Sequence, residues 1–310
     1  MQTLPPSFVQ TIRNTFGEAG ASWLDRLPVL LAESAARWSL TLAPAVANLS
    51  YNYVAPATLV DGTPVMLKLG VPNPEILTEI AALEHYDGHG ICKLLAADGE
   101  QGLLLLECLQ PGAMLSTLGD DDEATTIAAQ VMRTLWRPAP AEHNFPTVAR
   151  WGQGLGRLRQ RFAGGVGPFP QCLVEQAESI FAELLITPGE QVLLHGDLHH
   201  YNILSGRGGW LAIDPKGLVG EAAYETGALL RNEWGPDMTA LPQRTARRVA
   251  ILAEVLNQDR QRIIGWGIAQ AVLSAWWDYE DNGDGWAEQF ILAEVLAGLS
   301  SVPFLRTNCK

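Results

Sequence analysis

A polar loop between short apolar runs, at residues 191–220, constrains this chain more than any other feature. The loop reads HGDLHHYN and places Asp197 and Asn202 five residues apart, directly before the apolar pair Ile203-Leu204. Asp214 follows twelve residues after Asn202. Apolar runs this short, separated by polar loops and a glycine turn, indicate strands rather than helices. The sequence on both sides has helical periodicity, so a mainly helical domain must accommodate a few short strands that support one polar loop.

The first 110 residues have a different pattern. Residues 6–38 carry apolar positions at helical spacing and predict two amphipathic helices. Residues 47–69 predict a β-hairpin around Asp61-Gly62, and residues 75–86 predict a helix. Two apolar runs within residues 91–109, separated by a polar turn, predict a second hairpin.

Residues 110–112, Gln-Pro-Gly, end this β-rich pattern, and helical periodicity dominates beyond them. We therefore predict an α+β fold of two lobes. The expected boundaries are a small β-rich lobe with added N-terminal helices at 1–106, a hinge at 107–112 and a larger, mainly helical lobe at 113–310. A chain of 310 residues is long enough to bury a core in each lobe.

The formal charge of -13 argues against nucleic acid as a partner, because proteins that bind a phosphate backbone carry basic stripes. The charge is compatible with a cationic substrate, and equally with solubility alone. The four cysteines show no regular spacing, which favours reduced thiols over a zinc site or a disulfide framework. We find no signal peptide and no membrane span, and expect a cytoplasmic protein that is a monomer or a weak homodimer.

The spacing of Asp197, Asn202 and Asp214 is the spacing that phosphoryl transfer requires. The first aspartate accepts the proton of an acceptor hydroxyl, while the asparagine and the second aspartate hold magnesium at the phosphates. The same residues allow two other interpretations. The Asp and Asn side chains could merely cap turns, and His195 with His199 could bind zinc, although Gly196 argues against the helix that this zinc site needs.

The segments HGDLHHYNIL and AIDPKGLVGEAAYE resemble the aminoglycoside phosphotransferases, in particular the streptomycin and hydroxyurea phosphotransferase branch. The resemblance extends over nearly the whole chain. It implies a protein-kinase-like fold and a phosphotransferase that moves the γ-phosphoryl of ATP, with Mg²⁺, onto a hydroxyl of a small molecule. The implied acceptor is an aminoglycoside of the streptomycin type or hydroxyurea, and the implied outcome is antibiotic inactivation. His195 is expected to brace the loop.

Lys68 lies at the end of the apolar run VMLKL. In the kinase pattern such a lysine contacts the α- and β-phosphates and pairs with a helix carboxylate. Glu75, Glu79 and Glu84 are available on the following helix, and similarity to the family's pattern selects Glu79.

The resemblance also implies nucleotide contacts made mainly by the backbone. The Glu107 carbonyl and the Leu109 amide are the candidates for the purine edge, although a plain buried strand explains this segment equally well. The turn that would cover the phosphates, LSYNY, has no glycine, so its amides and the Ser50 hydroxyl are the candidate contacts.

Five further side chains are candidates for the acceptor pocket, because aromatic faces and carboxylates both attract guanidinium groups. They are Glu221, Glu225, Trp234, Trp277 and Asp278. The stretch 278–289 also resembles the start of an EF-hand, but its twelfth position is Gln289, so we expect a solvated acidic loop rather than a calcium site.

Two other functions fit the same motifs. One is a kinase of a metabolic alcohol or sugar. The other is an inactive kinase-like module that binds a small ligand, although the base and both metal ligands are present.

Overall fold

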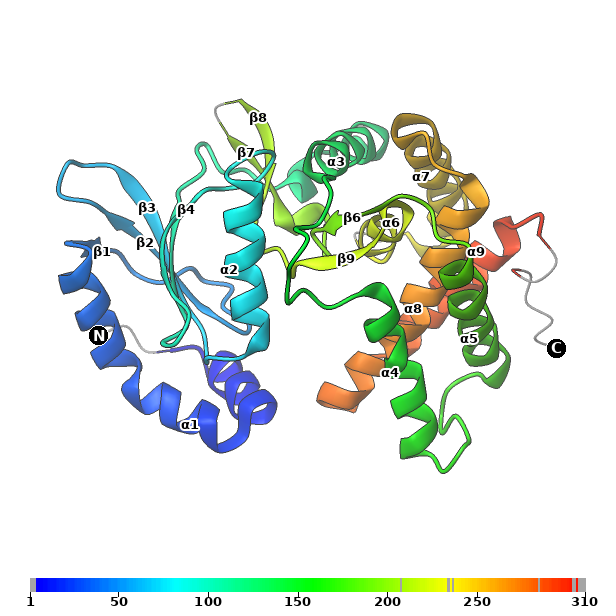
Figure 1. Ribbon diagram of the computed structural model, residues 1–310, viewed down its shortest axis with the longest axis horizontal. Helices are drawn as coiled ribbons and strands as arrows, with labels where there is room; N and C mark the ends of the chain where they lie inside the picture. The colour runs from blue at the N-terminus through cyan, green and yellow to red at the C-terminus, as the bar shows by residue number, and fades with distance from the viewer. Residues whose placement is uncertain are drawn as a thin grey trace. The chain divides into compact units, whose positions relative to one another are not determined.

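The computed structural model describes residues 4–206, 208–232, 235, 237–283, 285–302 and 305. The chain forms two compact units, Met1–Gly112 and Ala113–Lys310, here called the first and the second unit. Figure 1 shows the elements of each.

The first unit is built on an antiparallel five-stranded sheet with the order β1-β2-β3-β5-β4. Its strands are β1 (Thr41–Leu42), β2 (Tyr53–Thr58), β3 (Pro64–Leu69), β4 (Leu94–Asp98) and β5 (Leu103–Glu107). The β2–β3 hairpin turns at Asp61 and Gly62, as its sequence predicts. Gly62 has a φ of 85°, and the Asp61 carboxylate accepts a hydrogen bond from the Thr63 amide at 2.9 Å.

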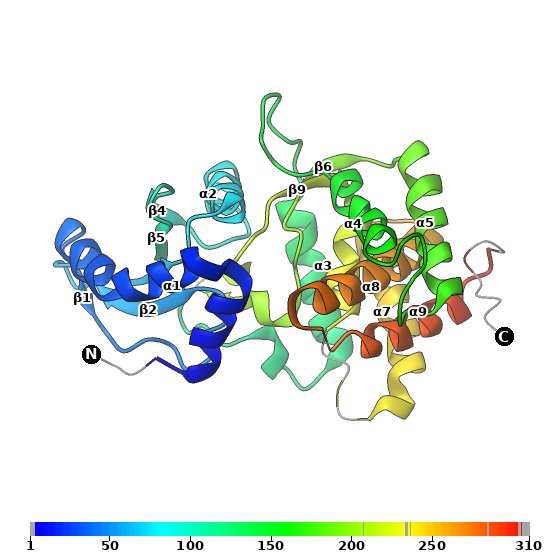
Figure 2. The ribbon, with the colours of Figure 1, turned by 90° about the horizontal axis from the view of Figure 1, so that it is seen from below.

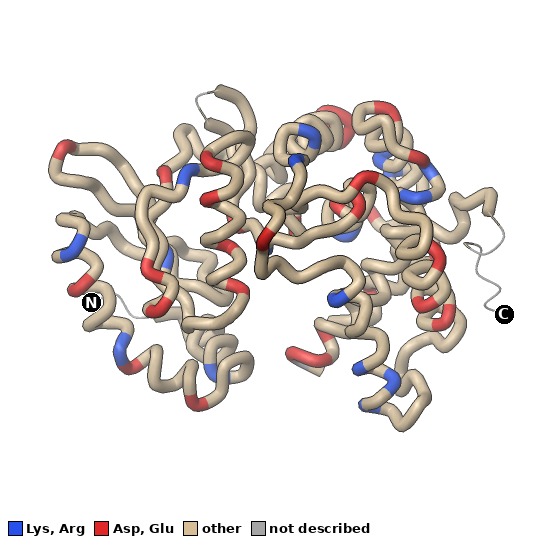
Figure 3. The backbone as a smooth tube through the Cα atoms, in the orientation of Figure 1, with Lys and Arg blue, Asp and Glu red and all other residues tan. Residues whose placement is uncertain are grey.

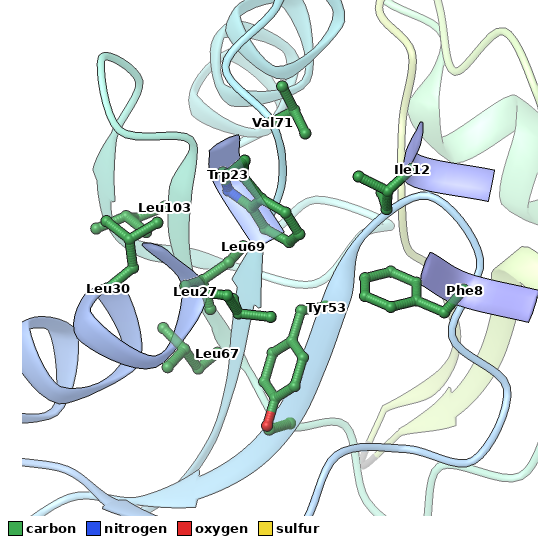
Figure 4. Packing of buried hydrophobic residues seen from close by; sticks show 11 residues of the cluster. Phe8, Ile12, Trp23, Leu27, Leu30, Tyr53, Leu67, Leu69, Val71 and Leu103 are labelled. Carbon is green, nitrogen blue, oxygen red and sulfur yellow. The ribbon is translucent and has the colours of Figure 1, made fainter. Parts of the chain in front are cut away.

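Helix α1 (Pro6–Arg37) covers one face of this sheet. It is broken at Gly17, whose φ of 55° and ψ of -129° are not helical, so it comprises the two helices expected from the sequence. Its apolar residues pack on β2, β3 and β5 in one core, which Figure 4 shows. The core contains Phe8, Ile12, Trp23, Leu27, Leu30, Tyr53, Ala55, Leu67, Leu69, Val71 and Leu103.

Helix α2 (Pro74–Tyr86) lies on the opposite face. The Asn73 side chain caps it by accepting hydrogen bonds from the amides of Glu75 and Ile76. Successive side chains of a strand point to opposite faces of a sheet. Because Leu67 and Leu69 enter the core under α1, Lys68 between them must point towards α2.

The second unit is mainly helical. Its helices are α3 (Asp121–Leu135), α4 (Val148–Arg161), α5 (Gln171–Ile186), α6 (Thr226–Leu230), α7 (Leu241–Leu256), α8 (Arg260–Asn282) and α9 (Ala287–Leu299). Helix α8 is buried on all sides from Ile263 to Trp276, as expected of a central helix, and Figure 2 shows α4, α5, α7 and α9 around it.

Two pairs of short strands interrupt the helices. β6 (Gln191–Leu194) pairs with β9 (Leu218–Glu221), and β7 (Ile203–Gly206) pairs with β8 (Gly209–Ala212). The polar loop at 195–202 therefore runs from β6 to β7, and Asp214 lies between β8 and β9.

Two expectations are wrong. The acidic stretch after Asp278 is not a loop, because residues 278–282 form the last turn of α8, which Gly283 ends in a left-handed conformation with a φ of 77°. Cys172 is disulfide-bonded, whereas Cys92 and Cys108 form no disulfide bond.

Charged residues are scattered over both units. Figure 3 shows basic residues interspersed with acidic ones, without a basic stripe along the part of the backbone that is described. Among the described residues, no helix is both long enough and apolar enough to cross a bilayer.

Candidate active site

The polar loop of the second unit is held by hydrogen bonds between its own ends. The Asn202 side-chain amide donates to the Asp197 carbonyl at 3.0 Å, and the Asn202 backbone amide donates to the His199 carbonyl at 2.9 Å. Since its nitrogen is used in the first bond, the Asn202 side chain has Oδ1 as the atom that can ligate a cation. Asp197 and Asn202 are thus brought together by the loop itself.

The Asp197 carboxylate is 30% exposed and lies between two basic side chains. Oδ2 is 3.6 Å from His199 Nε2, and Oδ1 is 3.4 Å from Arg231 Nη2. Burial alone raises the pKa of Asp197. The hydrogen bond and charge of His199, with the charges of Arg231 and Lys216, outweigh burial and hold the pKa below its ordinary value. Asp197 is therefore ionised at neutral pH and able to accept a proton.

His195 connects the loop to the strand that precedes Asp214. Its Nδ1 accepts a hydrogen bond from the Asp197 amide at 3.2 Å, so Nε2 carries the proton and donates to the Ile213 carbonyl at 2.7 Å. Burial lowers the pKa of His195 to about 4, which keeps the ring neutral. The side chain braces the loop, and these two bonds use both of its ring nitrogens. The described residues contain no group of three or more His, Cys, Asp or Glu placed to hold a metal.

Glu225 supports the same loop by accepting hydrogen bonds from its backbone. Its Oε2 accepts a hydrogen bond from the His195 amide at 2.6 Å, and Oε1 accepts one from the Gly196 amide at 2.9 Å. The residue is 1% exposed, and burial raises its pKa to about 7. The acceptor-pocket role expected for Glu225 does not fit this position. Its function here is to fix the backbone on which Asp197 is mounted.

Asp214 has an unusual backbone conformation. Its φ of 58° lies in the left-handed region, which costs free energy for a residue other than glycine and often marks a functional position. The Ile213 amide next to it donates to the Asn202 carbonyl at 2.9 Å, so the segments of the two predicted metal ligands are directly linked. An amide oxygen and a carboxylate are hard donors, and Mg²⁺ is commonly held by one or two such side chains together with substrate phosphates. The donor set therefore fits magnesium.

In the first unit, Lys68 and Glu79 form a buried ion pair. Lys68 Nζ lies 2.7 Å from Glu79 Oε1 and 2.9 Å from Oε2, and the residues are 3% and 6% exposed. Buried charges are costly unless they are paired, so the strand lysine and the helix glutamate hold each other in place. Neither Glu75 nor Glu84 takes this position in α2.

The expected purine and phosphate contacts are placed as follows. Glu107 ends β5, where its side chain accepts a hydrogen bond from the Lys93 amide at 3.1 Å and its backbone amide donates to the Lys93 carbonyl at 2.9 Å. Leu109 is 8% exposed. Ser50 is exposed and precedes β2.

Three of the remaining acceptor-pocket candidates lie in described positions. Glu221 is 3% exposed and its carboxylate is bound by Arg262, so it too does not fit the role expected for it. Trp277 packs edge-on against Trp151 with ring centroids 5.3 Å apart, and Asp278 follows it on α8. Trp234 lies outside the described residues.

The sequence reasoning missed two residues of this site. Trp151 on α4 packs beside Gly196, where an added Cβ would lie 3.2 Å from the indole ring. Because Trp151 also contacts Trp277, it links the end of α8 to the loop. Arg231, which follows α6, contacts Asp197. Neither residue belongs to a motif, and no local signal in the sequence distinguishes them from ordinary aromatic or surface residues.

The chain matches a family model described as aminoglycoside/hydroxyurea antibiotic resistance kinase over residues 37–283. It is 34% identical to a streptomycin 6-kinase of Streptomyces glaucescens, covering 90% of this chain and 92% of that protein. It is 33% identical to a hydroxyurea phosphotransferase of Kitasatospora aureofaciens, covering 95% and 86%.

Solved structures support the fold. An aminoglycoside phosphotransferase in ternary complex with ADP and hygromycin B has a TM-score of 0.64 at 14% identity, covering 87% of this chain and 99% of that one. Choline kinase LicA from Streptococcus pneumoniae has a TM-score of 0.63 at 16% identity, covering 88% and 99%. The predicted two-lobed, protein-kinase-like α+β fold is thereby confirmed, and so is the resemblance that the polar loop carries. The chain belongs to the aminoglycoside/hydroxyurea antibiotic resistance kinase family.

Proposed function

We propose that this protein transfers the γ-phosphoryl group of ATP to a hydroxyl of a streptomycin-type aminoglycoside, and thereby inactivates the antibiotic. The observation that carries the proposal is the placement of the Asp197 carboxylate on a loop that the Asn202 amide closes and that His195 links to the Asp214 segment. Streptomycin kinases among the relatives support the choice of acceptor.

Each polar side chain then has one role. Asp197 orients the acceptor hydroxyl and takes its proton as the oxygen bonds to phosphorus and ADP leaves. Asn202 Oδ1 and the Asp214 carboxylate would hold Mg²⁺, which supplies positive charge at the phosphates. Lys68, fixed by Glu79, would contact the α- and β-phosphates.

The nucleotide would bind the first unit chiefly through backbone groups. The Glu107 carbonyl and Leu109 amide would contact the purine, and Ser50 would contact the phosphates. The expected boundaries, a lobe at 1–106, a hinge at 107–112 and a lobe at 113–310, assign nucleotide binding to the first lobe and acceptor binding to the second. Trp277 and Asp278 remain the candidates for contacts to a cationic acceptor.

A coupled ADP-release assay tests the proposal. The purified protein is incubated with ATP, Mg²⁺ and either streptomycin, hydroxyurea or a panel of metabolic alcohols that includes choline, homoserine and sugars. We expect turnover with streptomycin and a product heavier by one phosphate. Turnover with a metabolite but not with streptomycin would mean that the metabolite is the acceptor. No turnover with any compound would favour an inactive module that binds a small ligand.

A further inference from the structure

Arg231 contacts Asp197, the proposed base, and no sequence motif predicts this contact. It follows the short helix α6, and its guanidinium bridges two elements: Nη2 lies 3.4 Å from Asp197 Oδ1, and Nη1 donates to Ser274 Oγ on α8 at 2.9 Å. The shorter bond anchors the guanidinium to the central helix. The longer one reaches the carboxylate.

The hydrogen bonding of Arg231 differs from that of Arg248 and Arg262, two other arginines of this unit with largely covered side chains. The guanidinium of Arg248 is bound by both oxygens of Asp121 and by the Asn232 carbonyl, and Arg262 is bound by both oxygens of Glu221. Arg231 is 14% exposed, yet its Nε has no hydrogen-bond partner among the described residues. A buried donor without a partner costs stability, so Arg231 occupies a position that does not satisfy all of its own hydrogen-bond donors.

A second carboxylate lies within the electrostatic reach of the same guanidinium. Asp278 is one turn beyond Ser274 on α8. Burial raises the pKa of Asp278, while the charge of Arg231 counteracts this rise, as it also helps to hold the pKa of Asp197 down. The positive charge of Arg231 therefore acts on both carboxylates.

We infer that Arg231 is a positioning residue for phosphoryl transfer: anchored by Ser274, it holds the Asp197 carboxylate in the orientation that accepts the proton of the acceptor hydroxyl. The inference rests on the proposed function. It implies that Arg231 acts on the chemical step in the second unit, so its loss lowers kcat without weakening the binding of ATP. A misplacement of about 1 Å at a reacting group can cost on the order of 100-fold in rate.

The test compares Arg231→Gln, Arg231→Lys and Ser274→Ala with the wild type in the ADP-release assay. We expect Arg231→Gln to lower kcat on the order of 100-fold, with the KM for ATP changed less than about threefold. Lysine retains the charge but not the planar fork, so Arg231→Lys should recover kcat to within about tenfold of the wild type. Ser274→Ala removes only the anchor and should lower kcat less than Arg231→Gln does.

The matched control is Arg247→Ala, which removes an arginine from an exposed ion pair with Asp122 and should leave kcat unchanged. Thermal unfolding of every variant separates folding from positioning. A wild-type kcat in Arg231→Gln overturns the inference while leaving the proposed function intact. Equal impairment of the lysine and glutamine variants, in step with lower melting temperatures, also overturns it, because the residue would then be only structural. An inactive wild-type protein instead refutes the proposed function.

Discussion

Variants of the buried ion pair between Lys68 and Glu79 can separate its contribution to the stability of the protein from its contribution to activity. Replacing Lys68 by methionine preserves most of the side-chain volume but leaves the Glu79 carboxylate, in a residue only 6% exposed, without its cation. Breaking a buried ion pair by removal of one partner costs about 3–5 kcal/mol. Since the whole unfolding free energy of a domain is about 5–15 kcal/mol, the loss is large.

The second change, Glu79→Leu, removes the stranded charge. An apolar pair in place of a buried ion pair is often neutral or stabilising, so the double variant should regain most of the lost stability. It should not regain activity, because no cation would remain on β3 to contact the phosphates.

The assay is urea unfolding followed by circular dichroism, alongside turnover of ATP and streptomycin. The expected pattern is a destabilised, inactive Lys68→Met variant and a stable, inactive double variant. Two results would refute the reasoning: a single variant as stable as the wild type, which would mean that the ion pair is not buried in solution, or an active double variant, which would mean that the lysine has no role at the phosphates.

Three further predictions concern the loop, the sheet and the metal. Glu225 has a pKa raised by burial from its ordinary value to about 7, so its contribution to stability is complete below about pH 4.5 and is lost as the pH rises through 7. The stability of wild type relative to Glu225→Gln should therefore fall over this range, and a pH-independent difference would contradict the account. Gly102→Ala should destabilise by more than about 1 kcal/mol in a melting experiment, because its φ of 71° disfavours a side chain and an added Cβ would lie 2.2 Å from the Gly70 carbonyl oxygen. Chelation of Mg²⁺ by EDTA should abolish turnover, and excess Mg²⁺ should restore it, if Asn202 and Asp214 hold the ion.

The parts of the fold that the sequence predicted are those with strong local signals. The β2–β3 hairpin follows from Asp61-Gly62, and the two N-terminal helices follow from apolar spacing on either side of Gly17. The acidic stretch after Asp278 resembles the start of an EF-hand loop in sequence, whereas in the structure the α8 helix continues until the left-handed Gly283.

Contacts between residues far apart in sequence limit how much of the site can be predicted from the sequence. The polar loop could be recognised because its spacing lies within one segment. The closeness of Glu225 to Asp214 in sequence predicts a role in the pocket, yet in the structure its carboxylate binds the backbone amides of His195 and Gly196 in the loop. The contact of Arg231 with Asp197 depends on how α6 packs on α8, which no local pattern encodes.

The most direct test of the central claim is the turnover of Asp197→Ala with streptomycin, ATP and Mg²⁺. The account predicts a fall in kcat of about 10²–10⁴-fold or more, with ATP binding by calorimetry and the melting temperature close to those of the wild type. Wild-type kcat in this variant would show that Asp197 is not the base and would contradict the mechanism.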